Sequence, residues 1–150
     1  MLGLSQELYL EKVLKRYEMS NSKGGLLPMG HGVHLSKSMS PKLDEDRLKM
    51  SNIPYASVVG SLMYAMLCTR PDIAYAVSVV SQFQANPGEQ HWMAVKTILK
   101  YLRRTKYMLL IYGNEDMRVD GYSDSDFQSD VDDRKSTSGF LFTLNGGAVS

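Results

Sequence analysis

Asp124 is the carboxylate of this chain that is best placed to bind a metal ion. It follows the apolar Val119 and Tyr122 at the end of an alternating, strand-like run. A backbone held by sheet pairing would aim this side chain at a hard cation such as Mg²⁺, which prefers oxygen ligands. A divalent cation needs several such ligands, and no second carboxylate in a comparable context follows Asp124 in the sequence. Asp124 alone therefore predicts an incomplete metal site.

A second group of residues could contact phosphates. Four cations near residue 100 are Lys96, Lys100, Arg103 and Arg104. The last three follow Lys96 by four, seven and eight residues, so on a helix all four would lie on one broad face. Such a face contacts a nucleic-acid backbone without reading its sequence. Cations also suit the C-terminal end of a helix dipole, and a solvated face would carry the same residues. The spacing leaves both interpretations open.

The net charge of +1 hides a division along the chain. Residues 1–107 contain 14 Lys and Arg against 8 Asp and Glu, whereas residues 108–150 contain 3 against 8. The first part could follow a phosphate backbone and the second could hold a divalent metal. Solvated helix faces would give the same counts.

Cysteine and histidine give weaker signals. Cys68 is the single cysteine, which excludes an internal disulfide framework, and its apolar helical surroundings predict a small buried side chain. His31 and His34 have a spacing that could seat a metal ion. Because no Cys or carboxylate cluster lies nearby, an ordinary loop pair is favoured over a zinc site.

Long consecutive runs of the chain resemble one family. The opening of the ribonuclease H domain in copia-type LTR-retrotransposon Pol polyproteins is similar to the run YSDSDFQSDVDDRKSTSGFLFTLNGGAVS. The segment that joins reverse transcriptase to ribonuclease H in these polyproteins is similar to SNIPYASVVGSLMYAMLCTRPDIAYAVSVVSQF and to HWMAVKTILKYLRRTK. The resemblance spans nearly the whole chain.

The resemblance implies a parent enzyme that copies retrotransposon RNA into DNA and removes the RNA strand, with Mg²⁺ as cofactor. The Tyr-x-Asp-Asp turn that carries the polymerase carboxylates is absent here. Of the ribonuclease H ligands, only the Asp of the first strand maps onto this chain, as Asp124, and the others are expected beyond Ser150. The chain is therefore expected to be an inactive fragment or degenerate copy that binds no metal tightly.

The partners implied by the resemblance are the backbone of an RNA–DNA hybrid or duplex, contacted weakly and non-specifically, and the remainder of the Pol polyprotein. One alternative is that the sequence is part of a longer, active polyprotein. Another is a co-opted or degenerate host interaction protein with no nucleic-acid role, such as an effector-like secreted factor. The sequence contains no signal peptide and no Arg-x-Leu-Arg motif, which disfavours the secreted factor.

An Asp-Asp pair at Val131-Asp132-Asp133 looks superficially like the polymerase turn. That turn needs an apolar strand on each side, whereas the neighbours here are polar, in ranges 128–130 and 134–136. The pair is therefore predicted to lie in a solvated connection between two strands.

The elements that would position these residues form an α+β architecture, with a helical thumb and connection layer followed by the first strands of an incomplete ribonuclease H-like sheet. Four segments are expected: an amphipathic helix at the end of the reverse transcriptase region, an extended connector, a helical thumb and connection segment, and the start of a ribonuclease H-like domain. They cover residues 1–19, 20–53, 54–107 and 108–150.

The apolar spacing predicts helices in the first three segments. The helix at 6–19 is expected to have Ser5 as its N-cap and an ion pair between Glu11 and Lys15. The connector is expected to contain at most a helical turn near 43–49. A helix after Pro54 buries Val59, Leu62, Met63 and Met66, while Gly60 and Ser61 admit a neighbouring helix. A third helix buries Ile73, Ala76, Val77, Val80 and Phe83, after a capping box of Thr69 and Asp72. A fourth, from Glu89, buries Trp92, Val95, Leu99 and Leu102.

From Met108 the apolar period shortens to two, which predicts strands at 108–112, 117–123, 139–144 and 147–150, with a turn at 113–116 and a two-residue hairpin at Asn145-Gly146. No apolar stretch is long enough for a membrane helix, and the N-terminus carries Glu and Lys instead of an apolar core. An intracellular location, in cytoplasm or nucleus, is therefore expected.

Overall fold

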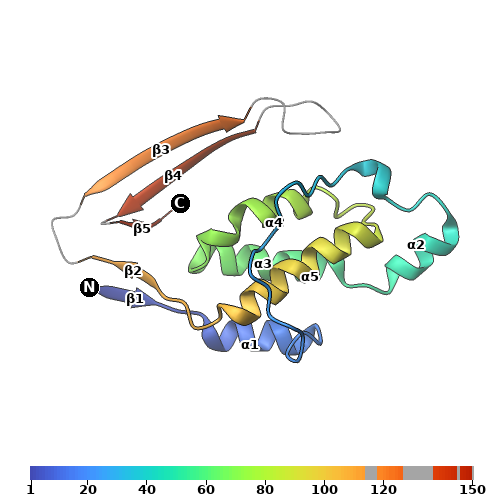
Figure 1. Cartoon of the computed structure of the whole chain (residues 1–150), viewed down its shortest axis with the longest axis horizontal. Coiled ribbons are helices and arrows are strands. Elements are labelled where there is room, and N and C mark those ends of the chain that lie inside the picture. Colours follow the sequence, from blue (N-terminus) through green and yellow to red (C-terminus); the bar gives the residue numbers. More distant parts are fainter. Residues whose placement is uncertain (114–117, 127–136, 145, 150) are drawn as a thin grey trace. The chain divides into compact units, whose positions relative to one another are not determined.

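The chain has an α+β fold, described by a computed structural model for residues 1–113, 118–126, 137–144 and 146–149. It divides into two compact units, one of residues 6–106 and one of residues 1–5 with 107–150. The first is helical and the second contains small antiparallel sheets (Figure 1). The two units are described separately below.

The helical unit contains α1 (Glu7–Arg16), α2 (Asp44–Ser51), α3 (Tyr55–Cys68), α4 (Ala74–Ser81) and α5 (Glu89–Arg104), with 3-10 turns at Lys37–Met39 and Pro71–Ile73. The four predicted helices are confirmed, with α1 shorter than expected. The connector was expected to contain at most one helical turn near 43–49; the structure has the two-turn helix α2 there.

One apolar core joins α1, α3, α4 and α5. Each helix contributes side chains spaced three and four residues apart, as the 3.6-residue period requires. The largest fully buried ones include Leu10, Leu62, Ile73, Val80, Ile98, Leu99 and Leu102. Met63, Met66 and Trp92, which the sequence predicts to be buried, lie half-buried at the edge of this core.

Four local predictions are wrong. The N-cap of α1 is Gln6, not Ser5, and Glu11 pairs with Lys106 (2.6 Å), not with Lys15. Gly60 lies on the side of α3 opposite its buried line, and among the described residues no helix approaches it. The neighbouring Ser61, as predicted, does meet a helix, since Tyr9 of α1 and Tyr17 at its end hydrogen-bond to it. Cys68 is exposed because the buried line of α3 continues past it to Thr69.

The second unit contains two sheets. In one, β1 (Leu2–Leu4) pairs antiparallel with β2 (Leu110–Tyr112). In the other, β3 (Val119–Asp126) pairs with β4 (Thr137–Leu144), and β5 (Gly147–Ala148) pairs with the end of β4. Strand β1 was not predicted, because three residues are too few to show a period of two.

The predicted hairpin after β4 is confirmed by the pairing of Leu144 with Gly147. Gly146 has a φ of 78°, which favours glycine at this turn. Residues 114–116 of the turn predicted at 113–116 lie outside the described residues, as does the Val131-Asp132-Asp133 segment. Within the described part of the chain, no helix is both long and apolar enough to cross a membrane.

Candidate nucleic-acid interface

The four predicted phosphate-contacting cations all lie on α5. The opposite side of this helix is buried by His91, Ala94, Val95, Ile98, Leu99 and Leu102. At a rise of about 1.5 Å per residue, Lys96 and Arg104 are separated by about 12 Å along the helix axis. The cations therefore form a stripe on the outer face of a helix whose position is fixed by the core.

Neighbouring groups orient two of these side chains. The Nε of Arg103 donates to the carbonyl oxygen of Ser20 at 2.8 Å. The ammonium of Lys96 lies 5.5 Å from the centre of the Trp92 ring. Both contacts leave the positive charge in place, so the stripe remains cationic.

A pair of glycines lets the connector lie directly against this end of α5. The amide of Gly25 donates to the carbonyl of Lys100 at 2.9 Å. A Cβ at Gly25 would lie 3.1 Å from the backbone nitrogen of Tyr101, and a Cβ at Gly24 would lie 3.2 Å from the Cβ of Arg104. The connector therefore borders the cationic stripe, which the sequence alone did not indicate.

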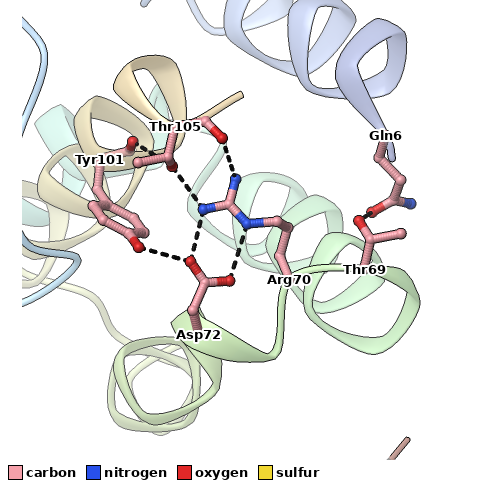
Figure 2. A network of polar contacts seen from close by, with 6 residues as sticks. All are labelled: Gln6, Thr69, Arg70, Asp72, Tyr101 and Thr105. Atoms are coloured by element: carbon pink, nitrogen blue, oxygen red, sulfur yellow. Dashed lines mark hydrogen bonds and ion pairs between the residues drawn. The ribbon is translucent and has the colours of Figure 1, made fainter. Parts of the chain in front are cut away.

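A buried arginine ties the last turn of α5 to the corner between α3 and α4 (Figure 2). Arg70 is 2% exposed and binds Asp72 in bidentate fashion, with N–O distances of 2.9 and 2.7 Å. Its Nη1 donates to the carbonyl of Thr105 at 3.1 Å, and its Nη2 donates to the Thr105 hydroxyl at 2.6 Å. Tyr101 donates its hydroxyl proton to Asp72 at 2.7 Å.

This network replaces the predicted capping box. Thr69 does not cap the following turn but donates to the Gln6 side chain at 2.8 Å, and Asp72 accepts from Arg70. The charged arginine needs a carboxylate and carbonyl partners once it is buried, and that requirement outweighs a local cap.

The network sets the pKa of two of its members. Burial acts to raise the pKa of the Asp72 carboxyl, but hydrogen bonds from Arg70 and Tyr101 and the Arg70 charge outweigh it, so the pKa lies below its ordinary value. Burial, and next the hydrogen bond to Asp72, raise the pKa of the Tyr101 hydroxyl. Asp72 is therefore ionised and Tyr101 protonated at neutral pH.

His91 fixes the other end of α5, and the sequence did not single it out. Its Nδ1 accepts from the Gly88 amide at 2.8 Å, so the proton of the neutral ring lies on Nε2, which donates to the Ser36 carbonyl at 3.0 Å. The ring also stacks on Phe83, with centres 4.0 Å apart. These contacts hold the connector near residue 36 against the start of α5.

The candidate metal residue lies in the other unit. Asp124 is exposed on β3, paired in register with Gly139. Among the residues that the structure describes, no three His, Cys, Asp or Glu side chains gather as a metal site would require. His31 and His34 are both exposed. Metal binding by Asp124 stays a prediction.

Three similar proteins indicate what this chain is related to. It is 53% identical over 149 residues to the retrovirus-related Pol polyprotein from transposon TNT 1-94 of Nicotiana tabacum, and 36% identical over 150 residues to that from transposon RE1 of Arabidopsis thaliana. It is 51% identical over 106 residues to the secreted RxLR effector protein 161 of Plasmopara viticola.

The two polyprotein matches each cover 99% of this chain but only 11% and 10% of the polyproteins. The effector match covers 67% of this chain and 72% of the effector. No family model and no solved structure matches the chain.

Proposed function

We propose that this chain supplies the part of a retrotransposon Pol polyprotein that holds nucleic acid by its backbone. The chain is homologous over nearly its whole length to copia-type retrotransposon Pol polyproteins, which supports the proposal. In this proposal residues 1–19 end the reverse transcriptase region and 20–53 are a connector. Residues 54–107 are the thumb and connection segment, and residues 108–150 begin a ribonuclease H-like domain. The observation that carries the proposal is the cationic stripe of α5.

The stripe has the chemistry for backbone contact. Its charges sit on one rigid helix, held at one end by the Arg70 network and at the other by His91. Lysine and arginine on a helix face release counterions from a nucleic-acid backbone when they bind, so affinity falls as salt rises. Nothing in this arrangement distinguishes one base from another, so binding is independent of sequence.

Charge reversal along the stripe provides the test. A variant with Lys96→Glu, Lys100→Glu, Arg103→Glu and Arg104→Glu should lose binding to a labelled RNA–DNA hybrid, measured by fluorescence anisotropy at low salt. Wild-type binding should be weak, equal for unrelated sequences, and about tenfold or more weaker after a fourfold rise in salt.

The matched control reverses four exposed cations elsewhere, Lys12, Lys15, Arg16 and Lys37, so that the net charge changes equally. Hybrid binding should then persist, reduced only by the change in net charge. A second variant replaces the same four stripe residues with Gln, which removes the positive charges without adding negative ones. It provides the test if the Glu variant does not fold. Equal loss in the stripe and control variants would contradict the proposal.

A second prediction concerns catalysis. We expect the purified chain to lack Mg²⁺-dependent cleavage of an RNA–DNA hybrid, because Asp124 supplies too few ligands for two metal ions. The assay follows a labelled RNA strand on a denaturing gel with Mg²⁺ and with EDTA. Cleavage that requires Mg²⁺ and disappears in Asp124→Asn would show that the chain forms a working metal site.

A co-opted interaction protein is the second candidate function. The observation that favours it is the 51% identity to a secreted effector, of which this chain covers 72%. Under this alternative the helical unit keeps its fold without a nucleic-acid role. A folded wild-type chain that does not bind hybrid at low salt would favour this alternative over the first proposal.

A further inference from the structure

A groove of 560 Å³ lies in the helical unit beside the first turns of α5. Its walls come from three segments: the connector at 39–42, α2 with Ile53 just after it, and α5 from Gly88 to Lys96. The volume lies within the range of about 300–1,000 Å³ that is typical of ligand sites.

The wall formed by the connector is held in place. His91 binds the Ser36 carbonyl just before this segment. At Gly88 the backbone of Met39 comes so close that a Cβ would collide with its carbonyl oxygen. The connector wall of the groove is therefore fixed by its packing against the start of α5.

The part of the lining formed by Trp92, Met50 and Ile53, called the floor here, is apolar and aromatic. Trp92 is half-buried, and its ring forms a tilted pair with that of Tyr55, with ring centres 6.5 Å apart. Met50 and Ile53 add apolar surface from the side of α2. A flat apolar group could pack here, since aromatic side chains favour stacked and tilted partners.

Cations border this floor. Lys96 lies over the Trp92 ring, and Lys42 is exposed on the connector side. Two acids also line the groove, but Asp46 is paired with Lys49 at 3.3 Å. Glu89 occupies the first turn of α5, where an acid is favoured by the helix dipole. The lining therefore carries three lysines, Lys42, Lys49 and Lys96, against these two acids, a net charge of +1 that favours an anion.

We propose that this groove binds one nucleotide of a single-stranded nucleic acid, in which the base displaces the Lys96 ammonium from the Trp92 ring and the phosphate lies near Lys42 and Lys96. An aromatic platform next to backbone-contacting cations is the combination that single-strand binding uses. An acidic peptide would match the lysines but has no flat ring for the platform. The inference rests on the proposed function, because Lys96 also belongs to the cationic stripe, and it adds a site for an unpaired strand.

Trp92 is the single tryptophan of the chain, so its fluorescence reports directly on the groove. A ten-nucleotide oligo-dT should quench this fluorescence and saturate, with the quench weakening as salt rises. Lys42→Glu should raise the apparent Kd about tenfold, because it places a negative charge beside the phosphate. Lys12→Glu, an exposed charge reversal on α1, should leave the Kd within about twofold.

A further variant separates this inference from the proposed function. Lys100→Glu, Arg103→Glu and Arg104→Glu should abolish hybrid binding while oligo-dT still quenches Trp92. Absence of quenching, or equal quenching in wild type and Lys42→Glu, overturns the groove assignment, whatever the hybrid result. A deca-glutamate peptide that quenches Trp92 as strongly as oligo-dT would also overturn it, because the groove would then be a general anion site.

Discussion

Replacement of Arg70 by methionine is expected to destabilise the helical unit by about 3 kcal/mol. The substitution keeps much of the side-chain volume but removes the charge that neutralises Asp72. It also leaves the Thr105 carbonyl and hydroxyl without their donor. We place the loss at the lower end of the range for a broken buried pair, because the Asp72 side chain is 30% exposed and water can partly solvate it.

Urea unfolding followed by circular dichroism measures this loss. The matched control is Arg47→Met, which removes an exposed arginine 3.6 Å from Asp44 and should change the free energy of unfolding by less than about 0.5 kcal/mol. Combining Arg70→Met with Asp72→Asn should recover part of the loss, since the unpaired carboxylate is then absent. Equal effects at Arg70 and Arg47 would show that the buried network contributes little.

The pH dependence of unfolding gives an independent readout of the same network. The folded-state pKa of Asp72 is lowered, so its contribution to stability is present above the ordinary Asp value of 3.8 and is lost as the pH falls through the folded-state pKa. The Asp72→Asn variant should therefore be less stable than wild type at pH 7. The difference between them should shrink below about pH 4.

The apolar periodicity predicted α1, α3, α4 and α5 because the pattern that defines a helix face is local. It placed Leu62, Val77 and Leu99 in the core, where the structure has them. The same local reasoning failed wherever a partner lies far along the chain. Arg70 was not singled out, since its partner Thr105 is 35 residues away and no spacing rule connects the two.

The cations of the candidate interface could be predicted from the sequence for the same reason. Lys96, Lys100 and the two arginines share a face because they share one helix, so their spacing sufficed. The connector that borders them did not follow from the sequence, where Gly24 and Gly25 indicated only an extended segment. Their close approach to α5 is a tertiary contact, and it gives the glycine pair a packing role.

Hydrogen exchange is expected to differ sharply between the two units. Amides of α3, α4 and α5 should exchange at least about a hundredfold more slowly than those of β3 and β4. The helices surround side chains that are almost fully buried, such as Leu62, Val80 and Leu99. Opening any of these helices exposes that core, so their exchange should require the largest openings.

Within the described residues, few contacts stabilise the sheet of β3, β4 and β5. Within the described residues β3 pairs only with β4, and β5 adds two paired positions. Phe140 and Phe142 contact each other but remain 68% and 44% exposed. A sheet this small usually needs a packed face to persist, so the amides of β3 and β4 should exchange through frequent local opening.

Hydrogen-exchange mass spectrometry on the whole chain at several protein concentrations measures this difference. Peptides from 55–104 should stay protected while those from 119–126 and 137–144 lose protection early. Burial of the exposed Phe140 and Phe142 in a larger assembly would stabilise the sheet. Slow exchange in β3 and β4 would therefore mean that a covering surface is present. Protection that rises with concentration would identify that surface as a second copy of the chain, and protection independent of concentration would place it within one copy.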